Sequence, residues 1–513
     1  MSSQRLEHTP QESPVKRTVL ATTALALVMG TAAAQELPQA GSTWFTDGQA
    51  LIEKMLARQP NTNRAKNVIL LVADGNGVGT NYAIRLLAGQ NAGKLGEEHV
   101  LPYEEFPNLA LVKTYNVNAQ TPDSAPTAGA MNTGVKQVFN TINLDPEKGV
   151  HGDCATEAGN ELTTFAEIAT GEGKAVGIIS TARVTHATPA AVYAKTANRN
   201  WESAVPEGCD TSRDIATQLV EQMDAGVIDF VMGGGRRNFL PSNVEAREGG
   251  SGRREDGRNL VAEMEDKGAQ YAWDQATFEA LKLDGSTPIV GLFENSHMKY
   301  EHDRTNEPSL AEMTEAAIKY LSSNENGYYL EVEAGRVDHA NHEGNAFRTL
   351  TDGIAFAEAV AKADELTDDA DTLIIVTADH EHAIAFNGYC GRGSPILGLC
   401  YSVKAGQVKH ADELETADDG KPYTVIGYLN GPGSVLKEAE GGYVGERPDV
   451  TQEEAVDPDY VQQALIPKSS ESHSGEDVAV YAKGPFSHLF DGTVEQNYIF
   501  HVMNHAAFGT DGQ

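Results

Sequence analysis

Residues 371–380 read DTLIIVTADH, a run of large apolar side chains that ends in an aspartate and a histidine. A continuous apolar run of this length is typical of a strand that is buried on both faces of a parallel sheet. Five further segments have the same character and are predicted to be strands. They are NVILLVAD from Asn67, AVGIIST from Ala175, VIDFVMGGG from Val227, GYYLEVEAG from Gly327 and VAVYAKGP from Val478.

Helical patterns lie between these strands. The segment SLAEMTEAAIKYLSS has apolar side chains at a spacing close to 3.6 residues, and AFRTLTDGIAFAEAVAKADEL from Ala346 predicts a longer helix. A further helix, FTDGQALIEKMLARQ from Phe45, is predicted before the first strand. Alternating strands and helices predict an α/β fold in which a central, mostly parallel sheet is flanked by helices on both faces.

Two regions break this alternation. Residues around 241–308 are polar, charged and glycine-bearing, and are predicted to be an excursion from the sheet. Residues around 388–446 are richer in glycine, tyrosine and turn signals, and are predicted to form a small inserted subdomain with short strands.

The composition limits the class of partner. The chain has 513 residues, of which 40% are hydrophobic, so it can bury a substantial core. It has 74 acidic and 39 basic residues and a formal charge of −35, which argues against binding to a nucleic-acid backbone or an anionic membrane. Two explanations of the charge remain open: adaptation to a salty habitat, as in a halophilic organism, and an ordinary acidic secreted protein.

The N-terminus has the pattern of a targeting segment. Lys16 and Arg17 precede the apolar run TVLATTALALVMGT, and AAAQ then offers a cleavage site that ends at Ala34. This predicts a secretory signal peptide over residues 1–34, a mature chain over 35–513, and a periplasmic or secreted protein. A membrane anchor is the alternative, but the run is short for a transmembrane helix.

Export would place the four cysteines in an oxidising compartment, where they are candidates for two disulfides. Cys390 and Cys400 are close in sequence and could close a short loop, in which case Cys154 and Cys209 would pair. The chain has no C-x-x-C motif, so a cysteine zinc site is not expected.

Carboxylates and imidazoles gather at the ends of the predicted strands. In open α/β sheets, ligands bind at the carboxyl ends of strands. Carboxylate oxygens and imidazole nitrogens are ligands for zinc and for harder divalent cations, so this pattern predicts a metal site. The residues concerned are Asp74, Glu333, Asp338, His339, His342, Asp379, His380 and His473.

The segment VNAQTPDSAPTAGAMNTG from Val117 supplies a candidate nucleophile, Ser124. Pro126 suits the first turn of a helix, so Ser124 would lie at a helix N-terminus, where an anion is favoured. An alcohol needs a base or a metal to become a nucleophile, and no G-x-S-x-G motif is present. Arg199, in KTANRNW, could bind phosphate through two hydrogen bonds. The alternative for Ser124 is a plain N-cap.

These residues occur in motifs that resemble those of the alkaline phosphatases, which are phosphomonoesterases with two zinc ions and one magnesium ion. The resemblance runs from about Asn67 to the C-terminal region, and several motifs are closer to the animal branch than to the enteric bacterial branch. The motifs are TPDSAPTAGA, TARVTHATPAAVYA, NRNW, GLFE, VEAGRVDHANHE, VTADHEH, NGPG and HSGEDVAVYAKGP.

The resemblance implies a role for each site residue. Ser124 would attack phosphorus and form a phosphoserine, Arg199 would hold two phosphate oxygens, and Asp123 would orient Arg199. One zinc would be held by Asp338, His342 and His473, and the second by Asp74, Asp379 and His380. The magnesium would be held by Asp74, Thr188 and Glu333.

At two positions this chain differs from the enteric bacterial enzymes, and the resemblance also implies further features of the family. His186 and His339 stand where the enteric enzymes have an aspartate and a lysine, and the animal enzymes have histidine at both places. Phe293, Glu294 and Glu307 resemble part of a further calcium site of the animal enzymes, whose remaining ligand is not evident. The family is homodimeric, the insertion at 388–446 resembles its crown subdomain, and the N-terminal helix would embrace the partner.

The expected activity is therefore hydrolysis of phosphate monoesters of many kinds at alkaline pH. The nearest enzyme alternative is a phosphodiesterase or a sulfatase-type metal hydrolase of the same superfamily. The non-enzyme alternative is an acidic secreted metal-binding protein.

Overall fold

The computed structural model describes residues 37–247 and 249–509, so the predicted signal peptide lies outside the described residues. Contacts divide the chain into two units, one that ends at Gln59 and one that begins at Pro60. The first unit contains helix α1 (Thr43–Leu56), which confirms the predicted N-terminal helix. No helix of the described chain is long and apolar enough to cross a membrane.

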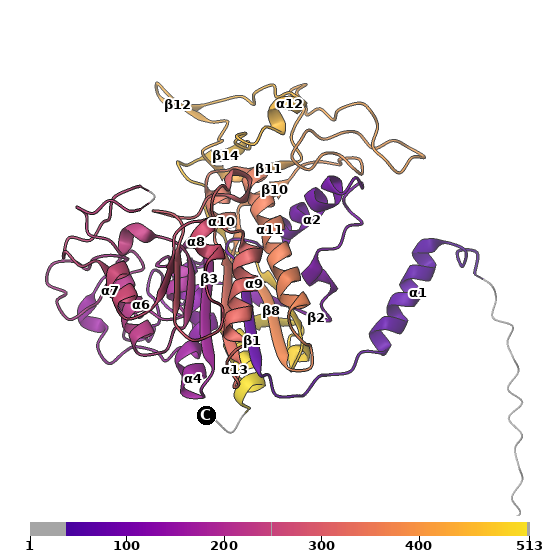
Figure 1. The fold of residues 1–513 in the computed structure, drawn as a ribbon. Helices are drawn as coiled ribbons and strands as arrows, with labels where there is room; N and C mark the ends of the chain where they lie inside the picture. The colour runs from indigo at the N-terminus through magenta and orange to yellow at the C-terminus, as the bar shows by residue number, and fades with distance from the viewer. Residues whose placement is uncertain (1–36, 248, 510–513) are drawn as a thin grey trace, which may run out of the picture. The chain divides into compact units, whose positions relative to one another are not determined.

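The second unit is built on a ten-stranded sheet with the order β17-β2-β16-β8-β1-β7-β3-β4-β6-β5 (Figure 1). All neighbours are parallel except that β16 runs antiparallel to both β2 and β8. All six predicted strands are present. The strands are β1 (Asn67–Ala73), β2 (Asn108–Lys113), β3 (Ala175–Arg183), β4 (Phe230–Gly234), β5 (Gln270–Ala272), β6 (Ile289–Leu292), β7 (Tyr328–Ala334), β8 (Thr372–Ala378), β16 (Val478–Lys483) and β17 (Thr493–Glu495).

The prediction that residues 241–308 leave the sheet is wrong in part. Strands β5 and β6 lie in this range and extend the sheet at its β4 edge. They have only three and four residues, so neither leaves an apolar run long enough to be recognised.

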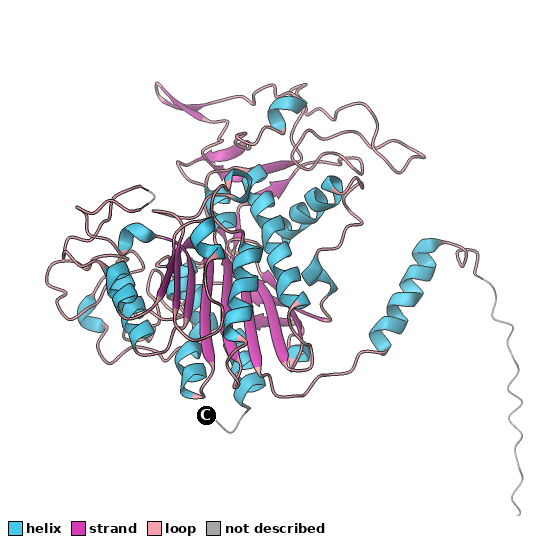
Figure 2. Cartoon of the chain, viewed as in Figure 1, coloured by secondary structure: helices cyan, strands magenta, loops and turns pink. Residues whose placement is uncertain are grey.

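Helices cover both faces of the sheet, as predicted (Figure 2). Successive residues of β1 show why: Val68, Leu70 and Val72 belong to one buried cluster, and Ile69 and Leu71 belong to the other. The helices are α2 (Val78–Asn91), α3 (Ser124–Thr133), α4 (Phe165–Gly171), α5 (Ala187–Ala190), α6 (Ile215–Asp224), α7 (Leu260–Asp266), α8 (Gln275–Glu279), α9 (Leu310–Leu321), α10 (Arg336–His342), α11 (Ala346–Glu365), α12 (Gln452–Ala455) and α13 (Tyr498–Phe508).

Short strands form three small sheets outside the main sheet, and of these strands only β11, β12 and β13 lie within the predicted insertion at 388–446. A three-stranded sheet has the order β10-β11-β14, and a hairpin pairs β12 with β13. A two-stranded pair, β15 with β9, lies next to the ends of the main strands. These strands are β9 (Glu381–His382), β10 (Ile384–Phe386), β11 (Ile426–Gly431), β12 (Lys437–Ala439), β13 (Gly442–Val444), β14 (Ala464–Pro467) and β15 (His473–Ser474).

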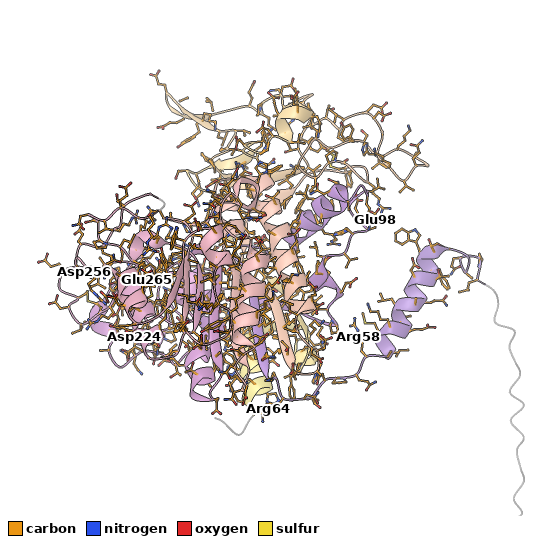
Figure 3. The ribbon with its side chains drawn as sticks, viewed as in Figure 1. Arg58, Arg64, Glu98, Asp224, Asp256 and Glu265 are labelled. Atoms are coloured by element: carbon orange, nitrogen blue, oxygen red, sulfur yellow. A yellow bond between two sulfur atoms is a disulfide. The ribbon has the colours of Figure 1, made fainter. Side chains whose placement is uncertain are left out.

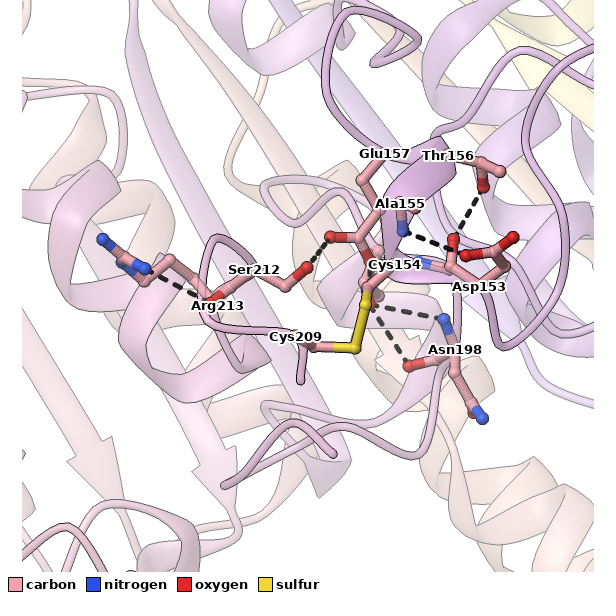
Figure 4. The surroundings of a disulfide bond; sticks show 11 residues. Asp153, Cys154, Ala155, Thr156, Glu157, Asn198, Cys209, Ser212 and Arg213 are labelled. Atoms are coloured by element: carbon pink, nitrogen blue, oxygen red, sulfur yellow. Dashed lines mark hydrogen bonds between the residues drawn. A yellow bond between two sulfur atoms is a disulfide. The ribbon is translucent and has the colours of Figure 1, made fainter. Parts of the chain in front are cut away.

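Two disulfides, Cys154–Cys209 and Cys390–Cys400, confirm both predicted pairs. Figure 4 shows the first of them, which joins two segments 55 residues apart in the chain. Glu157 extends the link, because it accepts hydrogen bonds from Ser212 and from the backbone N–H of Ala197. The disulfide and the hydrogen bond from Ala197 to Glu157 together restrict the segment that precedes Arg199.

The acidic residues are spread over the outside of the second unit. Figure 3 labels Glu98, Asp224 and Asp256, which come from separate segments and are all exposed. Each forms an ion pair, for example Glu98 with Arg392 at 2.7 Å. Because there are 74 acidic and 39 basic residues, 35 carboxylates (74 − 39) have no basic residue of their own to pair with.

Candidate active site

The site lies at the carboxyl ends of β1, β3, β7 and β8, where the sequence predicts it. Asp74 directly follows β1, and the next residue, Gly75, has a φ of +69°. Its N–H donates to Oδ1 of Asp379 at 3.0 Å, and a Cβ at Gly75 would lie 2.5 Å from the ring of His382. Only glycine fits this left-handed turn, which brings the ends of β1 and β8 together.

Ser124 is the first residue of α3 and is 2% exposed. Asp123 is the N-cap of this helix and accepts a hydrogen bond from the N–H of Ala125, so the N-cap role is taken by its neighbour. Oγ of Ser124 lies 3.1 Å from Nε2 of His380 and 3.5 Å from Oδ1 of Asp74. The hydroxyl thus faces candidate metal ligands rather than the backbone of its own helix.

The first group of candidate ligands is Asp74, Asp379 and His380, all of them buried. One ligand atom from each residue lies within 4.8 Å of the others. Nε2 of His380 is 3.3 Å from Oδ2 of Asp379 and 3.4 Å from Oδ1 of Asp74. These are the three residues that the resemblance assigns to the second zinc.

The second group is Asp338, His342, His382 and His473, and the resemblance assigns all of them except His382 to the first zinc. Nδ1 of His342 lies 2.6 Å from the carbonyl of Glu471, and Nδ1 of His473 lies 2.9 Å from the carbonyl of Pro122. Each Nδ1 must therefore carry the proton, which leaves the lone pair on Nε2. The two Nε2 atoms face each other at 3.1 Å, an arrangement that suits a shared cation.

The third group is Asp74, His186 and Glu333, with Thr188 nearby on α5. Oδ2 of Asp74, Oγ1 of Thr188 and Oε1 of Glu333 are buried and have no hydrogen-bond partner among the described residues. An unsatisfied buried polar atom costs about 1–3 kcal/mol, so three of them together fit a bound cation.

The electrostatics of the groups favour cations. Burial raises the pKa of Asp74 well above its ordinary value, and the carboxylates of Asp338 and Asp379 add to this effect. Burial lowers the pKa of His380 and of His342, so both rings are neutral and offer a lone pair. A site with crowded carboxylates and neutral imidazoles is suited to binding divalent metals.

Arg199 lies beside the same site. Its Nη1 donates to Oδ1 of Asp123 at 2.5 Å, and its Nη2 lies 3.0 Å from Nε2 of His186. Asp123 is thus placed where the resemblance implies, next to both Ser124 and Arg199.

A family model described as alkaline phosphatase matches residues 65–508 of this chain. The chain belongs to the alkaline phosphatase family.

Known alkaline phosphatases are similar over nearly the whole chain. The tissue-nonspecific isozyme of Gallus gallus is 42% identical over 485 residues, which cover 90% of this chain and 89% of that protein. The alkaline phosphatase of Gadus morhua is 42% identical over 483 residues, which cover 90% of this chain and 96% of that protein. This chain is therefore a phosphatase that hydrolyses phosphate monoesters, as the sequence predicts.

Solved alkaline phosphatases share the fold. The enzyme of Thermus thermophilus has a TM-score of 0.61 and 24% identity, and the match covers 89% of this chain and 94% of that chain. The enzyme of the Antarctic bacterium TAB5 has a TM-score of 0.59 and 21% identity, and the match covers 88% of this chain and 100% of that chain. The predicted α/β fold is thereby confirmed.

The structure adds two residues to this alkaline phosphatase site. Nε2 of His382 lies 2.8 Å from Oδ1 of Asp338, and its Nδ1 contacts Oε2 of Glu471. Burial lowers the pKa of His382, but the carboxylates of Glu471 and Asp338 outweigh it and raise that pKa to about 10. His382 is in the motif VTADHEH, but its role depends on the pairing of β9 with β15, which the sequence does not reveal.

His339 and the three residues of the suggested calcium site are not members of the three ligand groups among the described residues. His339 is buried, and its ring centroid lies 5.3 Å from that of His186. In the suggested calcium region, Lys299 pairs with Glu294 at 3.4 Å, and its backbone N–H donates to Oε1 of Glu307 at 2.8 Å. Burial raises the pKa of Glu307 to about 7, and its Oε2 has no partner among the described residues.

Proposed function

We propose that this phosphatase transfers the phosphoryl group of a monoester to Ser124 and then to water, at a site that holds two zinc ions and one magnesium ion. The observation that supports this most is the presence of three groups of candidate ligands, of which Asp74 and His380 lie within 3.5 Å of the buried hydroxyl of Ser124. Their donor atoms are imidazole nitrogens and carboxylate oxygens, which is the donor set of zinc and magnesium sites.

The residues divide among the ions as follows. Asp338, His342 and His473 would hold one zinc, and Asp74, Asp379 and His380 the other. Asp74, Thr188 and Glu333 would hold the magnesium. When bound, such ions lower the pKa of an alcohol or a water and neutralise charge on phosphoryl oxygens.

The chain's own groups bind and orient the phosphoryl unit. Arg199 would donate two parallel hydrogen bonds to its oxygens, and the amides at the start of α3 would face the same anion. Asp123 holds the guanidinium in place through its contact with Nη1. Oγ of Ser124 would attack phosphorus while the bond to the alcohol breaks, and water would then cleave the phosphoserine to release phosphate. Because these groups would contact only the phosphoryl group of the substrate, we expect the enzyme to hydrolyse monoesters of many different alcohols at alkaline pH.

His186 and His339 would favour rapid release of phosphate. Burial lowers the pKa of both rings, that of His339 to about 3, so neither adds a positive charge near the product. A solved mutant of the TAB5 enzyme, in which a histidine is replaced by aspartate, has Mg bound in a site called M3. We expect His186→Asp combined with His339→Lys to lower turnover and to tighten phosphate inhibition. Unchanged values would contradict this role.

The proposal includes a calcium ion at Phe293, Glu294 and Glu307. The unpaired Oε2 of Glu307 supports it, whereas the ion pair between Glu294 and Lys299 competes with it. Calcium should raise the melting temperature of the wild type but not of Glu307→Ala. An equal effect on both proteins would exclude this site.

We further propose a periplasmic or secreted homodimer that is adapted to salt. Light scattering would give its mass, and the N-terminal sequence of the exported protein would show whether it begins at Gln35. Activity measured from low to molar salt would test the adaptation, and a flat profile would contradict it.

The experiment that tests the reaction is hydrolysis of p-nitrophenyl phosphate at alkaline pH, with bound metal measured on the same samples. The wild type should be active with two zinc ions and one magnesium ion per chain. Ser124→Ala should bind the same metals and lose nearly all activity. Comparable activity in both proteins would refute Ser124 as the nucleophile.

A further inference from the structure

Three histidines from different strand ends meet beside the proposed magnesium site. His186 follows β3, His297 lies in the loop after β6, and His339 is in α10. The ring centroid of His297 lies 4.0 Å from that of His339 and 5.3 Å from that of His186. In the part of the chain that the structure describes, the three ligand groups do not include His297. Its ring therefore packs against both other histidines without belonging to a ligand group.

Arg183 contacts both ring nitrogens of His297. The backbone N of Arg183 lies 3.2 Å from Nδ1 of His297, and its Nη1 contacts Nε2 of the same ring. A neutral imidazole accepts at only one nitrogen, so one of these two contacts is a hydrogen bond and the other is a packing contact. Arg183 is itself fixed by Glu202, because Nε and Nη2 each donate to one carboxylate oxygen at 2.7 Å. Such a two-point contact sets the plane of a guanidinium as well as its position.

Glu202 is in turn anchored to the fold. Its Oε2 accepts hydrogen bonds from Oγ1 of Thr185 at 2.6 Å and from Nδ2 of Asn238 at 2.8 Å. Nδ2 of Asn238 also donates to Oγ1 of Thr185 at 2.8 Å. The carboxylate thus accepts from four donor atoms of three residues, which restrict its movement.

His297 would act on the phosphate-binding Arg199 through His186. Nε2 of His186 accepts a hydrogen bond from Nη2 of Arg199 at 3.0 Å, while Asp123 accepts from Nη1. The guanidinium of Arg199 is therefore held on two sides, by a carboxylate and by an imidazole. If the ring of His186 tilts, one of these two restraints on Arg199 is lost.

We propose that His297 is a positioning residue that, held by Arg183 and Glu202, fixes the rings of His186 and His339 and thereby aims Arg199 at the phosphoryl group. The inference rests on the proposed role of Arg199 as the group that binds phosphate. His297 does not touch the substrate in this scheme, and it acts through the orientation of His186.

The test is the affinity of metal-loaded protein for inorganic phosphate, measured by calorimetry together with kcat and KM. His297→Ala should weaken phosphate binding about tenfold, at the lower end of the 10- to 100-fold loss of metal affinity or activity that is typical when a residue supporting a metal ligand is changed. The loss in kcat/KM should come mainly from KM. Glu202→Gln should cause a smaller loss in the same direction. The double variant should bind phosphate no more weakly than His297→Ala alone, because both changes break one chain of contacts.

Met298→Ala is the matched control for packing of the same loop. Met298 is 2% exposed and belongs to the buried cluster on one face of the sheet. Its truncation should lower the melting temperature at least as much as His297→Ala does, with phosphate affinity unchanged. If Met298→Ala weakens phosphate binding as much as His297→Ala does, the effect is one of loop packing and the inference is wrong.

Arg199→Ala separates this inference from the proposed function. If it weakens phosphate binding while His297→Ala does not, the positioning role is refuted and the role of Arg199 stands. If neither change weakens binding, the proposed role of Arg199 fails, and the inference fails with it.

Discussion

Glu331 should make the stability of this protein fall as the pH rises. It lies in β7, two residues before Glu333, and is 1% exposed. Its Oε2 accepts from Nδ2 of Asn132 at 2.8 Å and from the hydroxyl of Tyr329 at 2.9 Å, while Oε1 has no partner among the described atoms. Burial raises the pKa of Glu331 from 4.5 to about 7, although the bonds from Asn132 and Tyr329 oppose this.

The sign and size of the effect follow from this difference in pKa. The folded protein holds the proton more tightly than the unfolded chain, so its extra stability is fully present below pH about 4.5. It is lost as the pH rises through about 7, and the total loss is about 3 kcal/mol. Glu331→Gln cannot lose a proton at this position and should not show this loss. The free energy of unfolding of the variant relative to the wild type should therefore rise by about 2 to 3 kcal/mol between pH 5 and pH 9.

The assay is thermal unfolding of both proteins across this pH range, at the same concentration of metal. For a folded unit of this size, about 1 kcal/mol corresponds to about 1 °C, so the difference in melting temperature should change by about 2 to 3 °C. Tyr329→Phe should act in the opposite direction, because it removes a donor to the charged form of Glu331. If the difference between Glu331→Gln and the wild type is the same at pH 5 and pH 9, the reasoning is refuted.

Three further predictions concern the metals and the disulfide. Glu471→Gln should loosen His382 and speed the loss of zinc during dialysis about tenfold, and metal retention equal to the wild type would contradict it. Removal of the Cys154–Cys209 disulfide by a double serine substitution should lower stability by about 4 kcal/mol, because it frees a loop of 55 residues, and an unchanged melting temperature would argue against this. A chelator should lower the melting temperature as well as the activity, since the grouped carboxylates repel one another without cations, and a stable apo-protein would show that the carboxylates are protonated instead.

The extent to which the sequence predicts this fold depends on burial. Strand β8 is buried at every position and appears as a continuous apolar run. Strand β2 alternates between buried and exposed positions near the sheet edge, so NLALVK does not stand out. Strands β5 and β6 are too short to be recognised, although they lie in the same sheet.

The site also contains residues that the sequence predicts and residues that it does not. Asp74, Asp379 and His380 directly follow apolar strands, so their convergence can be expected from the topology of a parallel sheet. His382 and His297 cannot be found in this way, because their roles come from contacts with Glu471 and Arg183, which are far from them in the chain. Such contacts exist only once the loops beyond the sheet have folded.

The most direct test of the central claim is to quench metal-loaded enzyme with acid during turnover and to map the phosphorylated peptide by mass spectrometry. The account predicts phosphate on Ser124, and no label after the metals have been removed with a chelator. A label on another residue, or equal labelling of Ser124 without metals, would contradict it.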